Sequence, residues 1–176
     1  MGKVLLALAR SWIASAVAAS GRKRIATISG PLDMGAGVDR LQGYREAIRQ
    51  AGLAMDDSYE ALGDFGQESG GVAMQALLGR HPDLDAVFCA SDVMASGALA
   101  ILRQHRRRVP QDIAVVGFDD STIATSTVPA LSSVRQPIEE MGREMARLLL
   151  DTGRAGGRQV ILATELVVRA SSGQGG

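Results

Sequence analysis

The chain has 176 residues, of which 46% are apolar and 22% are charged, a composition typical of a globular protein and unlike that of a disordered one. Nineteen basic residues balance nineteen acidic ones, so no net positive charge is available to hold DNA or an anionic membrane. A single cysteine excludes an intramolecular disulfide, and with only two histidines there is no zinc-type ligand cluster. We therefore expect neither a metal nor another cofactor.

Residues 1–20 admit two interpretations. A short basic start and the apolar run 4–9 resemble a secretory signal peptide. However, Arg10 interrupts the apolar run, and the apolar residues from Leu5 onward repeat with the spacing of an amphipathic helix. The run is also too short to cross a bilayer. The pattern favours a helix over residues 1–20, and the signal peptide is the alternative.

From residue 21 onward, short apolar runs alternate with amphipathic segments. In chain order we expect a strand at 24–29, a helix at 37–50, a strand at 58–62, a helix at 68–78, a strand at 86–90, a helix at 92–104, strands at 113–117 and 131–135, a helix after Pro137 and a strand at 160–168. Repeated strand–helix units with continuous apolar strands predict an α/β fold. Its sheet should be open and mostly parallel, with helices on both faces.

The sequence lacks the motifs of the common nucleotide-binding and hydrolytic enzymes. It contains no G-x-x-x-x-G-K-[ST] loop, no glycine spacing of the dinucleotide fingerprint after the first strand and no G-x-S-x-G turn. Cys89 lies inside an apolar strand, where a buried apolar role is expected. The run from Arg106 to Arg108 follows a helix, where cations complement the helix dipole. We expect a binding protein and not an enzyme.

Polar side chains follow the predicted strands, at the edge where open parallel sheets bind ligands. Ser91 and Asp92 close one strand, and Asp119 and Asp120 close another. Asp92 also suits an N-cap of the following helix, and Asp120 also suits a turn. A carboxylate at Asp119 facing Arg40 would offer the acceptors and bidentate donors that a hydroxyl-rich ligand requires.

Seven segments carry a family resemblance. They are IATISGP (25–31), RLQGY (40–44), GDF (63–65), DAVFCASDVMA (85–95), VPQDIAVVGFDD (109–120), LSSVRQP (131–137) and ELVVR (165–169). In this order and spacing they resemble the effector-binding domain of LacI/GalR transcriptional repressors, over about residues 20–171. Periplasmic sugar-binding proteins share that fold but seldom carry both the fifth and the sixth segment.

The resemblance implies a set of ligand-binding residues. They are Arg40, Phe65, Ser91, Asp92, Asp119 and Gln136. Arg40 matches the family's effector-binding arginine, Phe65 its aromatic stacking position and Asp119 its carboxylate contact. Ser91 stands where the family most often has asparagine, so the identity of the sugar stays open. The dimer contacts of the family would map near Ser96, Ala100, Ile123 and Thr127.

The resemblance also implies how the chain is organised. A helix at 1–20 would be left over from the N-terminal lobe or would be an atypical start, and residues 21–137 would form the effector-binding C-terminal lobe of a periplasmic-binding-protein-like fold. The remaining expected parts are a helix of the N-terminal lobe at 138–158, a closing strand at 159–170 and a disordered tail at 171–176. Most of the N-terminal lobe and the helix-turn-helix that reads DNA are absent from this sequence, so DNA would be bound only through that absent element.

We interpret the sequence as the effector-sensing portion of a cytoplasmic LacI-type regulator that binds a sugar or polyol, forms a homodimer and contacts no membrane. The alternative is a periplasmic sugar-binding protein of a transporter, which only the signal-like start supports. A phosphoacceptor receiver domain is disfavoured because no lysine ends a later strand. The helix after Pro137 carries an apolar stripe, for which we expect a partner in the first helix or in a second copy.

Overall fold

A computed structural model describes residues 3–7, 21–150 and 159–173 of the chain. The strands are β1 (Lys3–Ala7), β2 (Ile25–Ser29), β3 (Glu60–Leu62), β4 (Ala86–Cys89), β5 (Ala114–Asp119), β6 (Ser132–Arg135), β7 (Gln159–Ala163) and β8 (Glu165–Val167). The helices are α2 (Gly35–Gln50), the 3-10 turn η1 (Asp57–Tyr59), α3 (Gln67–Arg80), α4 (Asp92–Gln104), α5 (Thr122–Ser126) and α6 (Ile138–Leu150).

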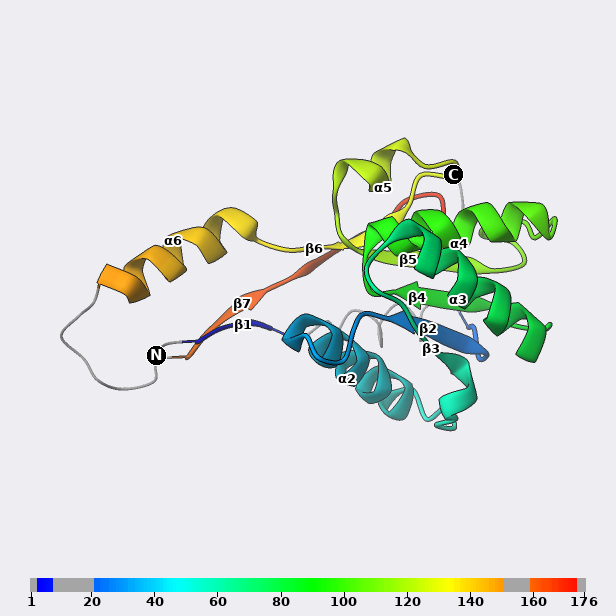
Figure 1. Ribbon diagram of the computed structural model, residues 1–176, viewed down its shortest axis with the longest axis horizontal. Coiled ribbons are helices and arrows are strands. Elements are labelled where there is room, and N and C mark those ends of the chain that lie inside the picture. The colour runs from blue at the N-terminus through cyan, green and yellow to red at the C-terminus, as the bar shows by residue number, and fades with distance from the viewer. Residues whose placement is uncertain (1–2, 8–20, 151–158, 174–176) are drawn as a thin grey trace.

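Six strands form the main sheet, in the order β3-β2-β4-β5-β6-β8. All neighbours pair in parallel except β6 and β8, which are antiparallel. The carboxyl ends of the parallel strands therefore meet at one edge of the sheet (Figure 1). The predicted open, mostly parallel α/β sheet is confirmed.

Helices cover both faces of this sheet (Figure 1). On one face, α3 and α4 bury side chains such as Met74 and Leu102 in the larger core. These two helices approach closely at Gly97, which has no side chain. A Cβ there would lie 2.0 Å from the carbonyl oxygen of Gln67, so the approach requires glycine. On the other face, α2 buries Tyr44 in a second core, which also contains residues of β4 and β5.

Residues 3–7 do not form the predicted helix. They form β1, which pairs in parallel with β7 from Lys3 opposite Gln159 to Ala7 opposite Ala163. A short apolar run has no periodicity that separates a strand from a helix, so the presence of a second apolar run as a pairing partner determines the outcome. The rest of that predicted helix lies outside the described residues.

The end of the chain also differs from expectation. The predicted closing strand is two strands in two different sheets, because β7 pairs with β1 and β8 pairs with β6. Ser171, expected in a disordered tail, is fully buried, and its carbonyl oxygen accepts a hydrogen bond of 2.9 Å from the N–H of Val115. The Ser171 hydroxyl donates to the Val115 carbonyl oxygen at 2.6 Å, so residues 171–173 extend the folded domain.

The helix predicted after Pro137 is α6, which lies beside β7 and away from the main sheet in Figure 1. None of its residues is buried, and the side chains of Ile138 and Leu149 are 65% and 79% exposed. Residues 3–7 of the helix expected as its partner form β1, which α6 contacts together with β7, and the rest of that predicted helix lies outside the described residues. No helix in the described ranges is long and apolar enough to cross a membrane.

Candidate functional site

The site is built around an ion pair between Arg40 on α2 and Asp119 at the end of β5. The Nη2 atom of Arg40 lies 3.2 Å from Oδ1 of Asp119, and its Nη1 atom donates to the carbonyl oxygen of Ala90. The Arg40 side chain is 12% exposed and that of Asp119 is 33% exposed. The pair is therefore largely enclosed by protein, but the carboxylate remains open to a ligand.

Aromatic rings and an amide surround this pair. The Arg40 guanidinium lies 4.0 Å from the ring centroid of Phe118 and 5.4 Å from that of Phe65. The side-chain N–H of Gln136, which follows β6, donates to Oδ1 of Asp119 at 2.5 Å. Four of the six predicted site residues are thus brought together from α2, β5 and two loops.

The electrostatics of the pair are those of a partly desolvated site. Burial raises the pKa of the Asp119 carboxyl above its ordinary value, and the positive charge of Arg40 offsets only part of this effect. Burial likewise lowers the pKa of the Arg40 guanidinium, against the opposing effect of Asp119. A cation and a carboxylate with little water around them can exchange that water for the hydroxyl groups of a ligand.

Ser91 and Asp92 lie behind the pair, and their polar atoms are already hydrogen-bonded. Ser91 is the N-cap of α4, a role expected of Asp92, because its Oγ accepts from the N–H of Met94 at 3.1 Å. Asp92 is 1% exposed, and its carboxylate accepts from the N–H of Ser121 at 2.7 Å and the hydroxyl of Ser133 at 2.5 Å. These bonds suit a role in bracing the site.

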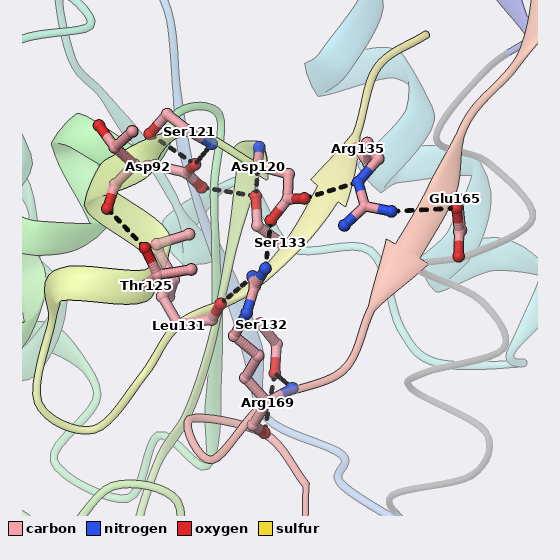
Figure 2. Close-up of polar contacts among 12 residues, drawn as sticks. Asp92, Asp120, Ser121, Thr125, Leu131, Ser132, Ser133, Arg135, Glu165 and Arg169 are labelled. Atoms are coloured by element: carbon pink, nitrogen blue, oxygen red, sulfur yellow. Dashed lines mark hydrogen bonds and ion pairs between the residues drawn. The ribbon is translucent and has the colours of Figure 1, made fainter.

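Asp120, which the sequence suggested as a turn residue, is the centre of an ionic network (Figure 2). Its two carboxylate oxygens form ion pairs with Arg169 and Arg135, each at 2.7 Å, and its side chain is 6% exposed. Burial acts to raise the pKa of Asp120, but the hydrogen bonds and charges of Arg169 and Arg135 outweigh it and lower the pKa. This network ties the end of β5 to β6 and to the segment after β8.

Several residues of the site carry strained backbone. In the described part of the chain, the non-glycine residues with positive φ are Phe65 (69°), Arg106 (54°), Asp119 (107°) and Asp120 (49°). Such conformations cost energy and cluster where a protein positions functional groups. Three of the four belong to the loops that carry the aromatic ring and the two carboxylates.

Sequence reasoning missed some contributors. Phe118 stacks on Arg40, and the signal that could have found it is alternation along β5, which places Phe118 with Val116 on the face that packs against α2. Gly117 makes room for the buried carboxylate, since a Cβ there would lie 2.3 Å from Oδ1 of Asp92.

Cys89 is fully buried, as expected, and burial raises the pKa of its thiol. The described residues contain no group of three side chains able to hold a metal ion.

Comparison with known proteins assigns the fold to a family. The profile of the periplasmic binding protein-like domain matches residues 14–172. The transcriptional regulator CelR of Thermobifida fusca is 56% identical over 155 residues, which is 86% of this chain and 46% of that protein. The repressor CytR of Escherichia coli K12 is 41% identical over the same shares of the two chains.

Solved structures agree with these relatives. A complex of the regulator CelR with cellobiose has a TM-score of 0.91 and 50% identity, covering 97% of this chain and 54% of that one. A lac repressor dimer bound to operator and an anti-inducer has a TM-score of 0.86 and 27% identity, covering 96% of this chain and 60% of that one. The chain therefore belongs to the periplasmic binding protein-like domain family, in the form carried by LacI-type regulators. It spans about half the length of the curated relatives it matches.

Proposed function

We propose that this chain is the effector-sensing part of a LacI-type transcriptional regulator, and that its effector is a sugar or polyol. The observation that carries the proposal is the enclosed Arg40–Asp119 pair with Gln136 and an aromatic ring at its side. Charged groups that form bidentate hydrogen bonds bind vicinal hydroxyls, and an aromatic ring packs on the apolar face of a sugar. The role is binding and not catalysis.

The comparisons favour a regulator over a periplasmic transporter component, because the relatives reported above are transcriptional regulators. The cellobiose complex of CelR makes cellobiose the first ligand to test. In the regulator, effector binding shifts an equilibrium between two arrangements of the protein and so changes its affinity for DNA. In such a regulator DNA is bound by a helix-turn-helix domain, and the location is the cytoplasm, where the DNA lies.

Titration calorimetry of the chain with cellobiose, glucose and ribose tests this proposal. We expect saturable binding of at least one of these sugars and its loss in Asp119→Ala and Arg40→Ala. Asp57→Ala, an exposed carboxylate in η1, is the matched control and should bind as the unchanged chain does. An unchanged binding constant in both site variants would contradict the assignment of the site.

We further propose that the regulator is a homodimer with contacts on α4 and α5. The contact residues implied by the resemblance are Ser96, Ala100, Ile123 and Thr127, of which Ala100 is exposed and the others are half-buried. Support comes from the likeness to a lac repressor dimer. Ala100→Arg should lower the mass measured by light scattering, whereas Ala76→Arg, at a position on α3 that is also exposed, should leave it unchanged. Equal masses for both variants would contradict this surface.

A further inference from the structure

A cavity of about 250 Å³ lies at the C-terminal end of α4, the opposite end from Ser91 and the Arg40–Asp119 site. Eight residues line it: Leu99, Arg103, Arg106, Arg107, Arg108, Val109, Val128 and Pro129. Four of the eight are arginines, and none is acidic. The chain as a whole has no net charge, so this is a local concentration of positive charge.

Neighbouring groups neutralise only part of that charge. Arg108 forms an ion pair of 2.6 Å with Asp112. Arg103 donates to the carbonyl oxygen of Val128 at 3.0 Å, and Arg107 donates to the carbonyl oxygen of Pro82. A carbonyl oxygen uses one of the five N–H donors of a guanidinium and removes no charge. Within the described part of the chain, the Arg106 guanidinium has no hydrogen bond or ion pair.

The C-terminal dipole of α4 does not account for this cluster. A helix end is equivalent to about half a negative charge, which is less than one guanidinium carries. The left-handed φ of 54° at Arg106 belongs to the C-cap of α4, in which the N–H of Arg107 donates to the carbonyl oxygen of Leu102. The cluster therefore keeps close to three positive charges around one recess, which like-charge repulsion disfavours until an anion enters.

The rest of the lining is apolar. Leu99 is buried, Val109 and Pro129 are half-buried, and Val128 is 76% exposed. A recess with apolar walls and guanidinium groups suits a ligand with an apolar body and an anionic head. Guanidinium groups bind phosphate oxygens in pairs of parallel hydrogen bonds, which favours phosphate over a halide. A polynucleotide fits less well, because the basic residues gather at one recess of limited volume.

We propose that this cavity is a second ligand site, for a small organic phosphate monoester. The site is separate from the Arg40–Asp119 pair and does not depend on the sugar proposal. Because α4 has 13 residues, the two sites are separated by about 20 Å along one helix that carries Ser91 at its start. Arg103 is three residues from Ala100 along the same helix, so the cavity also borders the proposed dimer surface.

Calorimetry of the chain with phenyl phosphate and with inorganic phosphate at low ionic strength tests the proposal. We expect one saturable site per chain, and tighter binding of phenyl phosphate because its ring contacts the apolar walls. Arg103→Gln and Arg106→Gln should each weaken binding about tenfold, through loss of a charged hydrogen bond. Arg80→Gln is the matched control, because Arg80 lies exposed at the end of α3 and also donates to a backbone carbonyl.

The outcomes with other variants and another probe distinguish a phosphate site at this cavity from binding at the sugar site and from a general effect of charge. Arg40→Ala should leave phenyl phosphate binding unchanged, and loss of binding in that variant would place the probe in the sugar site instead. An equal effect of Arg80→Gln would mean that only overall charge matters. Absence of saturable binding in the unchanged chain, or tighter binding of a short oligonucleotide that the same variants abolish, would also overturn the proposal. Thermal unfolding of each variant establishes that it is folded.

Discussion

The Arg40 guanidinium lies 3.2 Å from the Asp119 carboxylate, although 79 positions separate the two residues in the sequence. The contact depends on packing, since the Arg40 side chain extends from α2 to the end of β5 and its guanidinium stacks on the ring of Phe118. Both charges lose part of their water, and each is compensated by the other and by neutral groups. Ligand binding at this pair should therefore respond to pH and to the packing of its neighbours.

Sugar binding is expected to weaken as the pH falls below neutral, because the Asp119 carboxylate takes up a proton and the raised pKa brings this protonation nearer to neutral pH. The pKa of Asp119 is raised in the folded protein, so its carboxylate is protonated at a higher pH than an ordinary aspartate and loses its acceptor role there. Calorimetric titrations at several pH values measure this. Asp119→Asn should bind weakly with no such pH dependence, and an identical pH profile for that variant would contradict the role of Asp119.

Asp92→Ala is expected to lower the free energy of unfolding by about 1–3 kcal/mol or somewhat more, because Ser121 and Ser133 lose a charged acceptor in a buried place. Urea denaturation measures the change. Ser133→Ala should cost less than Asp92→Ala. The two effects should not be additive, because both variants remove the hydrogen bond between Ser133 and Asp92. The exposed Asp57→Ala is the control, and an equally large effect there would contradict the bracing role.

Gly30→Ala should destabilise the chain and weaken sugar binding. A Cβ at Gly30 would lie 2.2 Å from the ring of Phe65, so that ring must move, at a cost of about 1–3 kcal/mol. Adding Phe65→Ala to this variant should restore part of the stability but not the binding. Gly79→Ala, which has no neighbouring atom within 4 Å, should instead stabilise α3 by about 0.5–1 kcal/mol. Thermal unfolding distinguishes the two glycine variants.

Arg169→Met should destabilise the chain at neutral pH by about 1.5–3 kcal/mol, because Asp120 keeps only one of its two cationic partners. The pKa of Asp120 is lower in the folded than in the unfolded protein, so its stabilisation is complete above the unfolded value and is lost as the pH falls through the folded value. Without Arg169 the folded pKa rises, and acid unfolding should begin at a higher pH. Circular dichroism during acid titration checks this shift, with Arg147→Met on α6 as the control.

Much of the fold was predictable because local patterns determine it. Buried strands of parallel sheets are continuous apolar runs, and amphipathic segments separate them, so the order of the elements and the class of sheet follow from the sequence. Polar residues directly after such runs must reach the ligand-binding edge of the sheet. The place of Asp119 follows from this rule, whereas the role of Arg40, which lies within a helix, is implied only by the family resemblance.

Other features depend on contacts that local patterns do not contain. The run at residues 3–7 is a strand because β7 pairs with it, and Ser171 is ordered because it bonds to Val115, 56 positions away. Asp92 finds its partner Ser133 41 positions away, and the apolar walls of the arginine cavity come from two separate segments. Short runs and single polar residues have several conformations of similar energy, and long-range burial and hydrogen bonding select one of them only when the whole chain has folded.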